Sequence, residues 1–516
     1  MSNTLYGRAI LSCAVALVFA TALPISAQDE KPAATAQQTG NATAKPEPVK
    51  SVADLNKFPP LPQEKSAQAT MVLNGKTLHY TVTVGAYPTR DKDGKEIGEV
   101  VVTSYSMPGG NRPVTFAING GPGGSSVYLN FGAIGPKHLE FGDDGDSPSA
   151  PATLTDNQGT WLDFTDLVFI DPIGTGFSRS LVPDNQAKEL FYSTEADINY
   201  LSLVIYDWLL KNERLDSRKY IVGESYGGFR APRITYYLQS QIGVGINGMV
   251  LVSPALNFNI RNDGLNYSPL PWMLTLPSIV ASNLDRQHKL TSEAMQPVIA
   301  YDEGEYATAL IKGSSDPAAT DQMIQRVSEM TGLDPEFVKL SGGRLDAAAY
   351  LRELHRKQGK LGSIYDPNVT MIDPFPFAPQ QRANDPVLAT VIAPVTTAMV
   401  NFLTNTVGWK VDARYNALSY EVIRLWQRGD PPPDGSITQL RQAVAADPGM
   451  RVLIVHGWDD LTCPFMGSVL SVNQMPVMGN PARVSVHEYP GGHMFYTREA
   501  SRIALHNDTK DMVTTH

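Results

Sequence analysis

A serine set between glycines offers the clearest chemistry in this 516-residue chain. Gly223-Glu224-Ser225-Tyr226-Gly227 follows a short apolar run and precedes a helical pattern. The glycines allow a sharp strand-to-helix turn, which exposes a serine hydroxyl at the carboxyl edge of a sheet. The pattern predicts Ser225 as a nucleophile, with a plain glycine-rich turn as the alternative.

A serine nucleophile needs two partners further along the chain. The hydroxyl is a poor nucleophile until a neutral imidazole takes its proton, and the imidazole needs an anion to fix its tautomer. In α/β-hydrolases these groups follow in the order Ser, acid, His. Asp460 follows the apolar run Val452–Val455, and His493 lies in a later glycine-rich segment. Asp459 is the rival acid. His456 is the rival base, but its place within a predicted strand is more typical of a core histidine.

A second glycine-rich loop, Asn119-Gly120-Gly121-Pro122-Gly123-Gly124, directly follows the apolar run Val114–Ile118. Backbone N–H groups approach a ligand closely only where side chains are absent, and a loop after an early strand supplies one oxyanion donor in such enzymes. We expect the N–H groups of Gly121 and Tyr226 to form an oxyanion hole. The alternative is a phosphate loop, but the loop carries no GKS/T as in a P-loop, and no GxGxxG with a ribose-binding acid downstream is found.

Short, nearly continuous apolar runs predict the strands that position these residues. Such runs suit strands buried on both faces, as in a parallel sheet covered by helices. They are Val114–Ile118, Leu167–Ile170, Tyr220–Val222, Met249–Val252, Val452–Val455 and Val484–His487. Ser193–Leu210 gathers its apolar residues on one helical face, and strands alternating with helices predict an α/β fold. Upstream, the alternating segments Thr70–Val84 and Glu99–Ser106 predict an antiparallel hairpin.

The strand–helix alternation stops between residues 263 and 447, which show no clear strand run. Helical patterns such as Pro335–Ser341 and Ala347–Gln358 occur there. We therefore predict a core formed by residues 66–262 and 448–516, with a mainly helical cap at 263–447 inserted between them. Caps of this kind often shape substrate pockets, whereas a merely structural insert is the alternative.

The N-terminal residues 1–27 are typical of a secretory signal peptide. Arg8 precedes the apolar run Ala9–Leu23, and Ile25-Ser26-Ala27 suits cleavage. The run is shorter than the ~20 residues that span a membrane, so no retained anchor is expected. Residues 28–65, rich in Ala, Gln, Thr, Pro and Lys, predict a flexible linker. The protein is expected to be exported, to the periplasm or the medium.

The composition narrows the possible function classes. With 42% hydrophobic and 18% charged residues, the chain is globular rather than disordered or collagen-like. A net charge of -10 without a Lys/Arg cluster argues against a nucleic-acid binder. Of the two cysteines, one lies in the predicted signal peptide, so Cys463 would remain without a disulfide partner. The pattern indicates no cofactor and carries no signal for an oligomeric state.

Taken together, the motifs resemble the serine carboxypeptidase family, in its bacterial secreted branch. The matching segments run in order from about residue 70 to the end. They are Asn119–Gly123 with Ser125-Ser126, Asp171–Ser178, Gly223–Gly227, Pro232, Asp460 with Cys463-Pro464, and Gly491-Gly492-His493-Met494.

The resemblance implies an α/β-hydrolase fold and release of C-terminal residues from peptides, usually at acidic pH. It selects Ser225, Asp460 and His493 as the catalytic triad, with Asp460 preferred to Asp459. It also implies that Asn119 and Glu224 bind the terminal carboxylate of the substrate. From the same motifs we include Gly120 and Met494 among the substrate-binding candidates.

Two positions depart from the family pattern. The usual second acid, which pairs with the acid before the serine, falls by spacing at Ala133, and an aromatic residue before the Asn-Gly-Gly loop falls at Ala117. A carboxyl group can donate a hydrogen bond to a substrate carboxylate only when it is protonated. The two losses are expected to weaken the binding of the substrate carboxylate by Asn119 and Glu224, while leaving the triad and oxyanion hole intact.

Several alternatives stay open from the sequence. An esterase, an aminopeptidase or an acyltransferase could use the same scaffold, and a catalytically inactive envelope binding protein is a different class. Metal hydrolysis through His456, His487 and His493 is disfavoured because no HExxH motif is present. Cys463, three residues after Asp460, either lies near the pocket or is a small buried hydrophobic residue.

Overall fold

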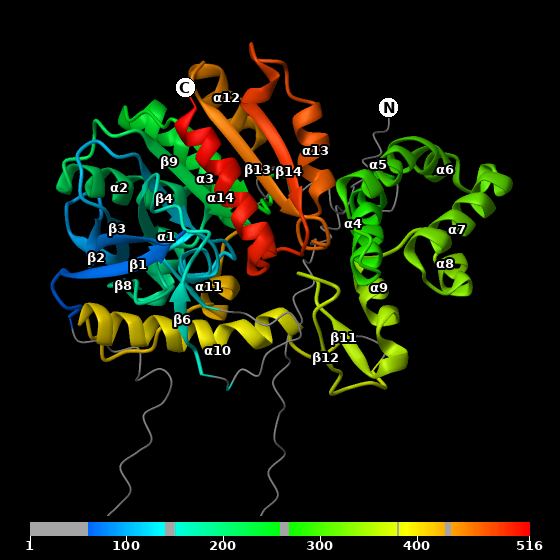
Figure 1. Ribbon diagram of the computed structural model, residues 1–516, viewed down its shortest axis with the longest axis horizontal. Coiled ribbons are helices and arrows are strands. Elements are labelled where there is room, and N and C mark those ends of the chain that lie inside the picture. Colours follow the sequence, from blue (N-terminus) through cyan, green and yellow to red (C-terminus); the bar gives the residue numbers. More distant parts are fainter. Residues whose placement is uncertain are drawn as a thin grey trace, which may run out of the picture.

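A ten-stranded sheet forms the centre of the protein. The computed structural model describes residues 60–139, 149, 151–257, 268–378, 381–428 and 435–515, so the predicted signal peptide and most of the predicted linker lie outside the described residues. The strand order is β1-β2-β3-β7-β4-β9-β10-β13-β14, with the short β8 (Arg179–Ser180) beside β3. Figure 1 shows the sheet with helices on both sides.

Six neighbouring strands of the sheet are parallel. They are β7 (Asp166–Ile170), β4 (Val114–Ile118), β9 (Lys219–Glu224), β10 (Gly248–Val252), β13 (Arg451–Gly457) and β14 (Val484–Tyr489). Each of the six apolar runs forms one of these strands. The predicted α/β fold with a mostly parallel sheet is confirmed. Because the strands are parallel, their carboxyl ends meet at one edge, where the loops bearing Ser225, Asp460 and His493 begin.

The antiparallel end of the sheet contains β1 (Lys65–Leu73), β2 (Lys76–Arg90) and β3 (Glu96–Ser106). The predicted pairing of Thr70–Val84 with Glu99–Ser106 is found as the β2–β3 hairpin. However, Thr70–Val84 is not one strand, because a turn at Asn74-Gly75 divides it. Both turn residues have positive φ, 48° and 76°, which Asn and Gly tolerate best.

Two sets of helices cover the sheet and build a core on each face. One set is α1 (Asp184–Phe191), α2 (Thr194–Lys211), α3 (Tyr226–Tyr237) and α12 (Ile437–Ala446). The other is α10 (Pro386–Asn401) and α14 (Glu499–Thr514). The helix predicted over Ser193–Leu210 is confirmed as α2. Ser193 is its N-cap, with a side-chain oxygen that accepts the Ala196 N–H.

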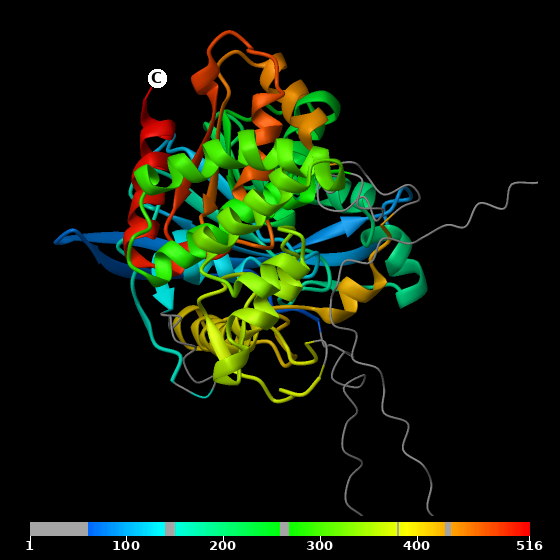
Figure 2. The same cartoon turned by 90° about the vertical axis from the view of Figure 1, so that its right-hand side faces the viewer.

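A third group of helices lies beside the sheet, at the right of Figure 1 and toward the viewer in Figure 2. It comprises α4 (Leu270–Arg286), α5 (Ser292–Tyr301), α6 (Ala307–Lys312), α7 (Pro317–Thr331), α8 (Pro335–Leu340) and α9 (Ala347–Leu354). Its apolar core also takes in Trp458, Phe465 and Met466, which follow β13. The helices therefore pack directly against the segment that carries Asp460.

Several short elements complete the fold. The hairpin of β11 (Lys360–Gly362) and β12 (Thr370–Ile372) lies in the region where no strand run was recognised. The others are β5 (Lys137–Leu139), β6 (Leu154–Asp156), α11 (Tyr420–Leu425) and α13 (Phe465–Asn473).

Helix α10 continues into a wider turn, so that Pro386–Val407 forms 22 residues, and its most apolar stretch has a mean hydropathy of 1.7. By length and composition alone such a helix could cross a membrane. In this fold 39% of its most apolar stretch is buried. Val391, Val395 and Met399 on its inner face belong to the core of the sheet. A helix that packs on a core through one face can pass the same test as a membrane span.

Candidate active site

Ser225 occupies a strained turn between β9 and α3. Its backbone has φ 59° and ψ -119°, a conformation that residues with a Cβ rarely adopt. A Cβ added at Gly227 would lie 2.2 Å from the Ile118 carbonyl oxygen, so only glycine allows this close approach. The glycines thus fit the turn that the sequence predicted, and they hold Ser225 at the end of β9.

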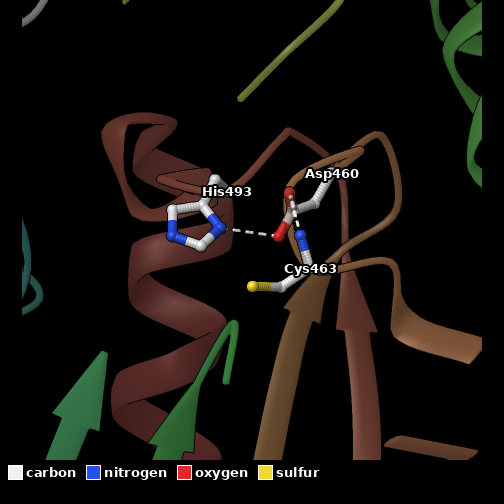
Figure 3. Close-up of side chains that lie close together, drawn as sticks. All are labelled: Asp460, Cys463 and His493. Atoms are coloured by element: carbon white, nitrogen blue, oxygen red, sulfur yellow. Dashed lines mark hydrogen bonds and ion pairs between the residues drawn. The ribbon is translucent and has the colours of Figure 1, made fainter. Parts of the chain in front are cut away.

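Asp460 and His493 meet across the neighbouring loops after β13 and β14. The His493 Nδ1 lies 2.7 Å from Asp460 Oδ2, and both side chains are buried (Figure 3). The other oxygen, Oδ1, accepts the N–H groups of Thr462 and Cys463 at 2.7 and 2.9 Å. With both oxygens engaged as acceptors, the arrangement favours a proton on Nδ1, which makes Nε2 the nitrogen that can accept a proton.

One short segment after β10 ties Ser225 and His493 together. The Ser225 N–H donates to the Val252 carbonyl at 2.9 Å, and the Ser225 carbonyl accepts the Ala255 N–H at 3.1 Å. Between them, the Ser253 hydroxyl donates to the His493 carbonyl at 2.8 Å. The backbones of both residues are therefore bound to segment 252–255.

Asp459, the rival acid, faces a different partner. Its carboxylate lies 3.7 Å from the guanidinium of Arg498 and is fully buried. Burial, together with the nearby carboxylates of Asp366 and Asp285, raises the pKa of Asp459 well above its usual range. The structure therefore brings His493 to Asp460, whereas Asp459 belongs to an acidic cluster around Arg498.

His456, the rival base, is a buried side chain with partners at both ring nitrogens. Nδ1 lies 3.1 Å from the Cys463 carbonyl, and Nε2 lies 2.8 Å from the Ser468 hydroxyl. Burial lowers the pKa of His456 to about 4, so the ring stays neutral at most pH values. These contacts are those of a core histidine.

The glycine-rich loop after β4 lies against the N-terminus of α3. A Cβ at Gly120 would lie only 2.5 Å from the backbone nitrogen of Tyr226, so the loop backbone approaches that N–H closely. The next residue, Gly121, has φ 112°. The Gly124 N–H donates to the Gly120 carbonyl at 2.9 Å and closes the loop. The structure therefore places Gly120, and next to it Gly121, beside Tyr226.

The Asp171–Ser178 motif supports this loop through hydrogen bonds of Asp171. Asp171 Oδ1 accepts the Ser126 N–H at 2.8 Å. The Tyr415 hydroxyl lies 3.4 Å from Asp171 Oδ2 and 3.1 Å from the Ser125 hydroxyl. A Cβ at Gly176 would lie 2.0 Å from Asp171 Oδ2, which explains the glycine there. Burial raises the pKa of Asp171 to about 7. The sequence indicated the motif but not this supporting role.

Asn119 and Glu224 lie side by side next to Ser225. The Asn119 Nδ2 donates to Glu224 Oε2, and the Asn119 Oδ1 accepts the Leu129 N–H at 3.0 Å. The other oxygen of Glu224 accepts the Tyr496 hydroxyl at 2.9 Å. Burial, partly offset by these hydrogen bonds and by His493, raises the pKa of Glu224 to about 7.

The remaining sequence candidates are also buried. Met494 directly follows His493, and its carbonyl accepts the Thr497 N–H at 2.9 Å. Ala133 and Ala117, where the family has an acid and an aromatic residue, are fully buried. Neither alanine can donate a hydrogen bond to a substrate or to Glu224 through its side chain.

Two groups at the site escaped the sequence analysis. Arg230 in α3 forms a fully buried ion pair with Asp197 at 2.6 Å and donates to the Asn119 carbonyl at 2.7 Å. An arginine among apolar residues after the serine motif was the available signal. Tyr365, between β11 and β12, places its ring edge-on to His493, with ring centres 5.3 Å apart. No local pattern marks Tyr365, because its role depends on how the helical segment folds back onto the core.

Asp460, Cys463 and His493 also have the donor types of a metal site. Their candidate ligand atoms all lie within 4.8 Å of one another. Figure 3 shows the three side chains close together. However, both oxygens of Asp460 already accept hydrogen bonds, and one of those donors is His493 itself. The donor set therefore fits an acid–histidine pair at least as well as it fits an ion.

Comparisons with known proteins concern the family and the fold. The family model for serine carboxypeptidases matches residues 89–358, just over half of the chain. Serine carboxypeptidase-like 36 of Arabidopsis thaliana is 33% identical over 161 residues, 30% of this chain and 31% of that protein. The retinoid-inducible serine carboxypeptidase of Rattus norvegicus is 30% identical over 172 residues, 30% of this chain and 34% of that protein. The matches thus span about a third of these curated relatives.

A solved structure extends the likeness to most of the fold. Kex1(delta)p, a prohormone-processing carboxypeptidase from Saccharomyces cerevisiae, aligns over 84% of this chain and 91% of its own, with a TM-score of 0.52 and 17% identity. At that identity the likeness concerns the fold alone, and the α/β-hydrolase fold expected from the sequence is confirmed.

Proposed function

Because the chain belongs to the serine carboxypeptidase family, we propose that it is an exported enzyme that releases C-terminal residues from peptides through Ser225, Asp460 and His493. The observation that carries the proposal is the buried hydrogen bond between His493 and Asp460, together with a strained Ser225 whose backbone is bound to the same segment 252–255 as that of His493. Export rests on the predicted signal peptide at residues 1–27.

In the first half of the reaction, the Ser225 Oγ attacks the carbonyl carbon of the last peptide bond and passes its proton to Nε2 of His493. Asp460 stabilises the imidazolium that forms. The negative charge on the carbonyl oxygen is held by the N–H groups of Gly121 and Tyr226, and losing one such donor typically costs about 10²–10³ in rate.

The second half releases both products. The C–N bond breaks as His493 returns its proton to the leaving amine, which departs as the C-terminal amino acid and leaves an ester on Ser225. Water then loses a proton to His493 and attacks the ester. The proton returns to Ser225 Oγ, and the shortened peptide leaves with a new carboxyl group.

Asn119 and Glu224 would select for the chain end. They lie beside the nucleophile, and a protonated Glu224 can donate to a terminal carboxylate that an ionised Glu224 would repel. Gly120 and Met494 complete the proposed substrate-binding set. This arrangement favours a free C-terminus over an ester or an N-terminal residue.

The test measures which end of an N-blocked dipeptide is released by the wild-type chain and by Ser225→Ala. We expect release of the C-terminal residue and a loss of about 10⁶ in kcat without the nucleophile. Ser471→Ala is a matched control, because its buried hydroxyl donates to the Gly467 carbonyl of its own helix. Near-wild-type activity of Ser225→Ala, or turnover confined to esters or aminoacyl amides, would refute the proposal.

A further inference from the structure

Tyr496 makes a contact that neither the motifs nor the proposed mechanism uses. Its side chain is fully buried, and it follows His493 by three residues. Its hydroxyl donates to Glu224 Oε1 at 2.9 Å. Because Asn119 donates to the other oxygen, each oxygen of Glu224 has one neutral donor. Among the residues that the structure describes, no lysine or arginine pairs with this carboxyl group.

The contact between Tyr496 and Glu224 differs from the family pattern, in which a second acid, here replaced by Ala133, pairs with the acid before the serine. Ala133 lies within the buried helical segment Tyr128–Ile134, and its carbonyl accepts the Asn157 Nδ2 at 2.9 Å. Its methyl group offers no hydrogen bond to Glu224. A phenol from the other end of the chain therefore meets the carboxyl group that a second acid would otherwise pair with.

We infer that Tyr496 is a positioning residue, which holds Glu224 as a single titrating acid and lowers the pH at which the site stops binding free C-termini. The inference rests on the proposed function and concerns the substrate subsite of that same site. A phenol differs from a second carboxyl group in that it does not compete with Glu224 for one proton.

The groups around Glu224 set the direction of the pH effect. His493 faces Glu224 from the loop after β14 and lowers its pKa, whereas Asp460 faces it from the loop after β13 and raises its pKa. Tyr496 and Tyr128 face it as phenols. Burial raises the pKa of Glu224 to about 7, and burial also keeps the pKa of Tyr496 well above its usual value. Tyr496 thus stays neutral while Glu224 titrates.

The hydroxyl of Tyr496 can serve both protonation states of Glu224. It donates to the carboxylate above pH 7, and below that pH it can still donate to the carbonyl oxygen of the carboxylic acid, which leaves the O–H of Glu224 for a substrate carboxylate. In the protonated state Glu224 binds a substrate carboxylate, whereas in the ionised state it repels one. We expect KM for peptides with a free C-terminus to rise as the pH passes about 7.

The sign of the Tyr496→Phe effect follows from the lost donor. Removing a hydrogen bond to the ionised form disfavours that form, so Glu224 stays protonated to a higher pH. The midpoint of the KM rise is expected to move up by about one pH unit, the size of one hydrogen bond to a charged group. At pH 5.5, where Glu224 is already protonated, kcat is expected to change by less than about threefold.

The experiment measures KM and kcat from pH 5 to 8.5 for an N-blocked dipeptide and for its C-terminal amide. The amide carries no charge at its end, so its KM should show no rise near pH 7. Glu224→Gln should give a flat KM for the acid substrate, and adding Tyr496→Phe to it should change nothing further. Tyr306→Phe is the matched control, because its buried hydroxyl donates to the Gly343 carbonyl among the helices α4–α9, away from Glu224.

Each outcome decides the inference. An unshifted midpoint in Tyr496→Phe, or an equal loss of kcat at every pH, would assign Tyr496 a merely structural role. If Tyr496→Phe fails to fold, a KM rise that persists in Glu224→Gln overturns the inference by itself. Loss of dipeptide hydrolysis in the wild-type chain would instead overturn the proposed function, so the two failures are distinguishable.

Discussion

Asp459 and Asp460 are adjacent, fully buried acids. The structure predicts a large loss of kcat when Asp460 is changed to Asn and little change when Asp459 is. In Asp460 the Oδ1 position accepts two backbone N–H groups, from Thr462 and Cys463. An asparagine must keep its oxygen there, because an NH₂ group cannot accept from them. Its NH₂ group then faces Nδ1 of His493 and donates to it.

This reversal changes the tautomer of the base. With Nδ1 acting as an acceptor, the ring proton moves to Nε2, which can no longer take a proton from Ser225. The wrong tautomer typically costs about 10⁴ in kcat, or about 5.4 kcal/mol of transition-state stabilisation at about 1.36 kcal/mol per factor of ten. We expect Asp460→Asn to lose about this much while remaining folded.

Asp459→Asn is the matched control. Its carboxylate faces Arg498 at 3.7 Å rather than His493, so kcat is expected to stay within about tenfold of wild type. The assay is dipeptide hydrolysis, with circular dichroism to confirm folding. The reasoning is refuted if Asp460→Asn keeps more than about a tenth of the wild-type kcat, or if Asp459→Asn loses as much as Asp460→Asn.

Two further predictions concern the neighbourhood of the site. Arg498→Met should destabilise the protein by about 3 kcal/mol at pH 8, because Asp285, Asp366 and Asp459 lose their shared, partly buried cation. Burial raises the pKa of Asp285, but the hydrogen bonds from Arg498 outweigh burial and hold that pKa below its usual range. The loss of stability in Arg498→Met should therefore be smaller at pH 5, where the unpaired acids take up protons. An equal loss of stability at both pH values in thermal unfolding would contradict this. Cys463 is buried, with its sulfur within 4.8 Å of ligand atoms of Asp460 and His493, so a bulky thiol reagent should label it slowly and abolish activity in step with labelling. Cys463→Ser should resist the reagent, and full activity after complete labelling would show that the thiol points away from the pocket.

The parallel sheet could be predicted because its signal is local. A strand buried on both faces must be apolar throughout, and each of the six runs formed a strand at nearly the predicted residues. The missed turn at Asn74-Gly75 also had a local signal, since Asn-Gly favours the two positive φ values found there. It was overlooked because the alternation of side chains continues on both sides of the turn.

The site could be predicted only in part, because some of its residues are defined by contacts between distant segments. The spacing of Ser225, Asp460 and His493 suggested a triad, but two adjacent acids were available and only the loop after β13 determines which of them reaches His493. Tyr496 gave no signal, because its partner Glu224 lies 272 residues earlier. Tyr365 gave none either, because the β11–β12 hairpin was not recognised.

The close approach of Tyr365 to the backbone explains why Gly492 precedes the histidine. A Cβ at Gly492 would lie 2.0 Å from the Tyr365 carbonyl oxygen, and that same oxygen accepts the His493 N–H at 2.6 Å. The backbone of His493 is therefore held from two directions, since Ser253 bonds its carbonyl from the end of β10. If His493 is the base, the segment carrying Tyr365 helps to set its position relative to Ser225. Changes in that segment would then alter kcat as well as KM, although Tyr365 lies far from Ser225 in the sequence and follows the helices α4–α9 rather than a strand of the central sheet.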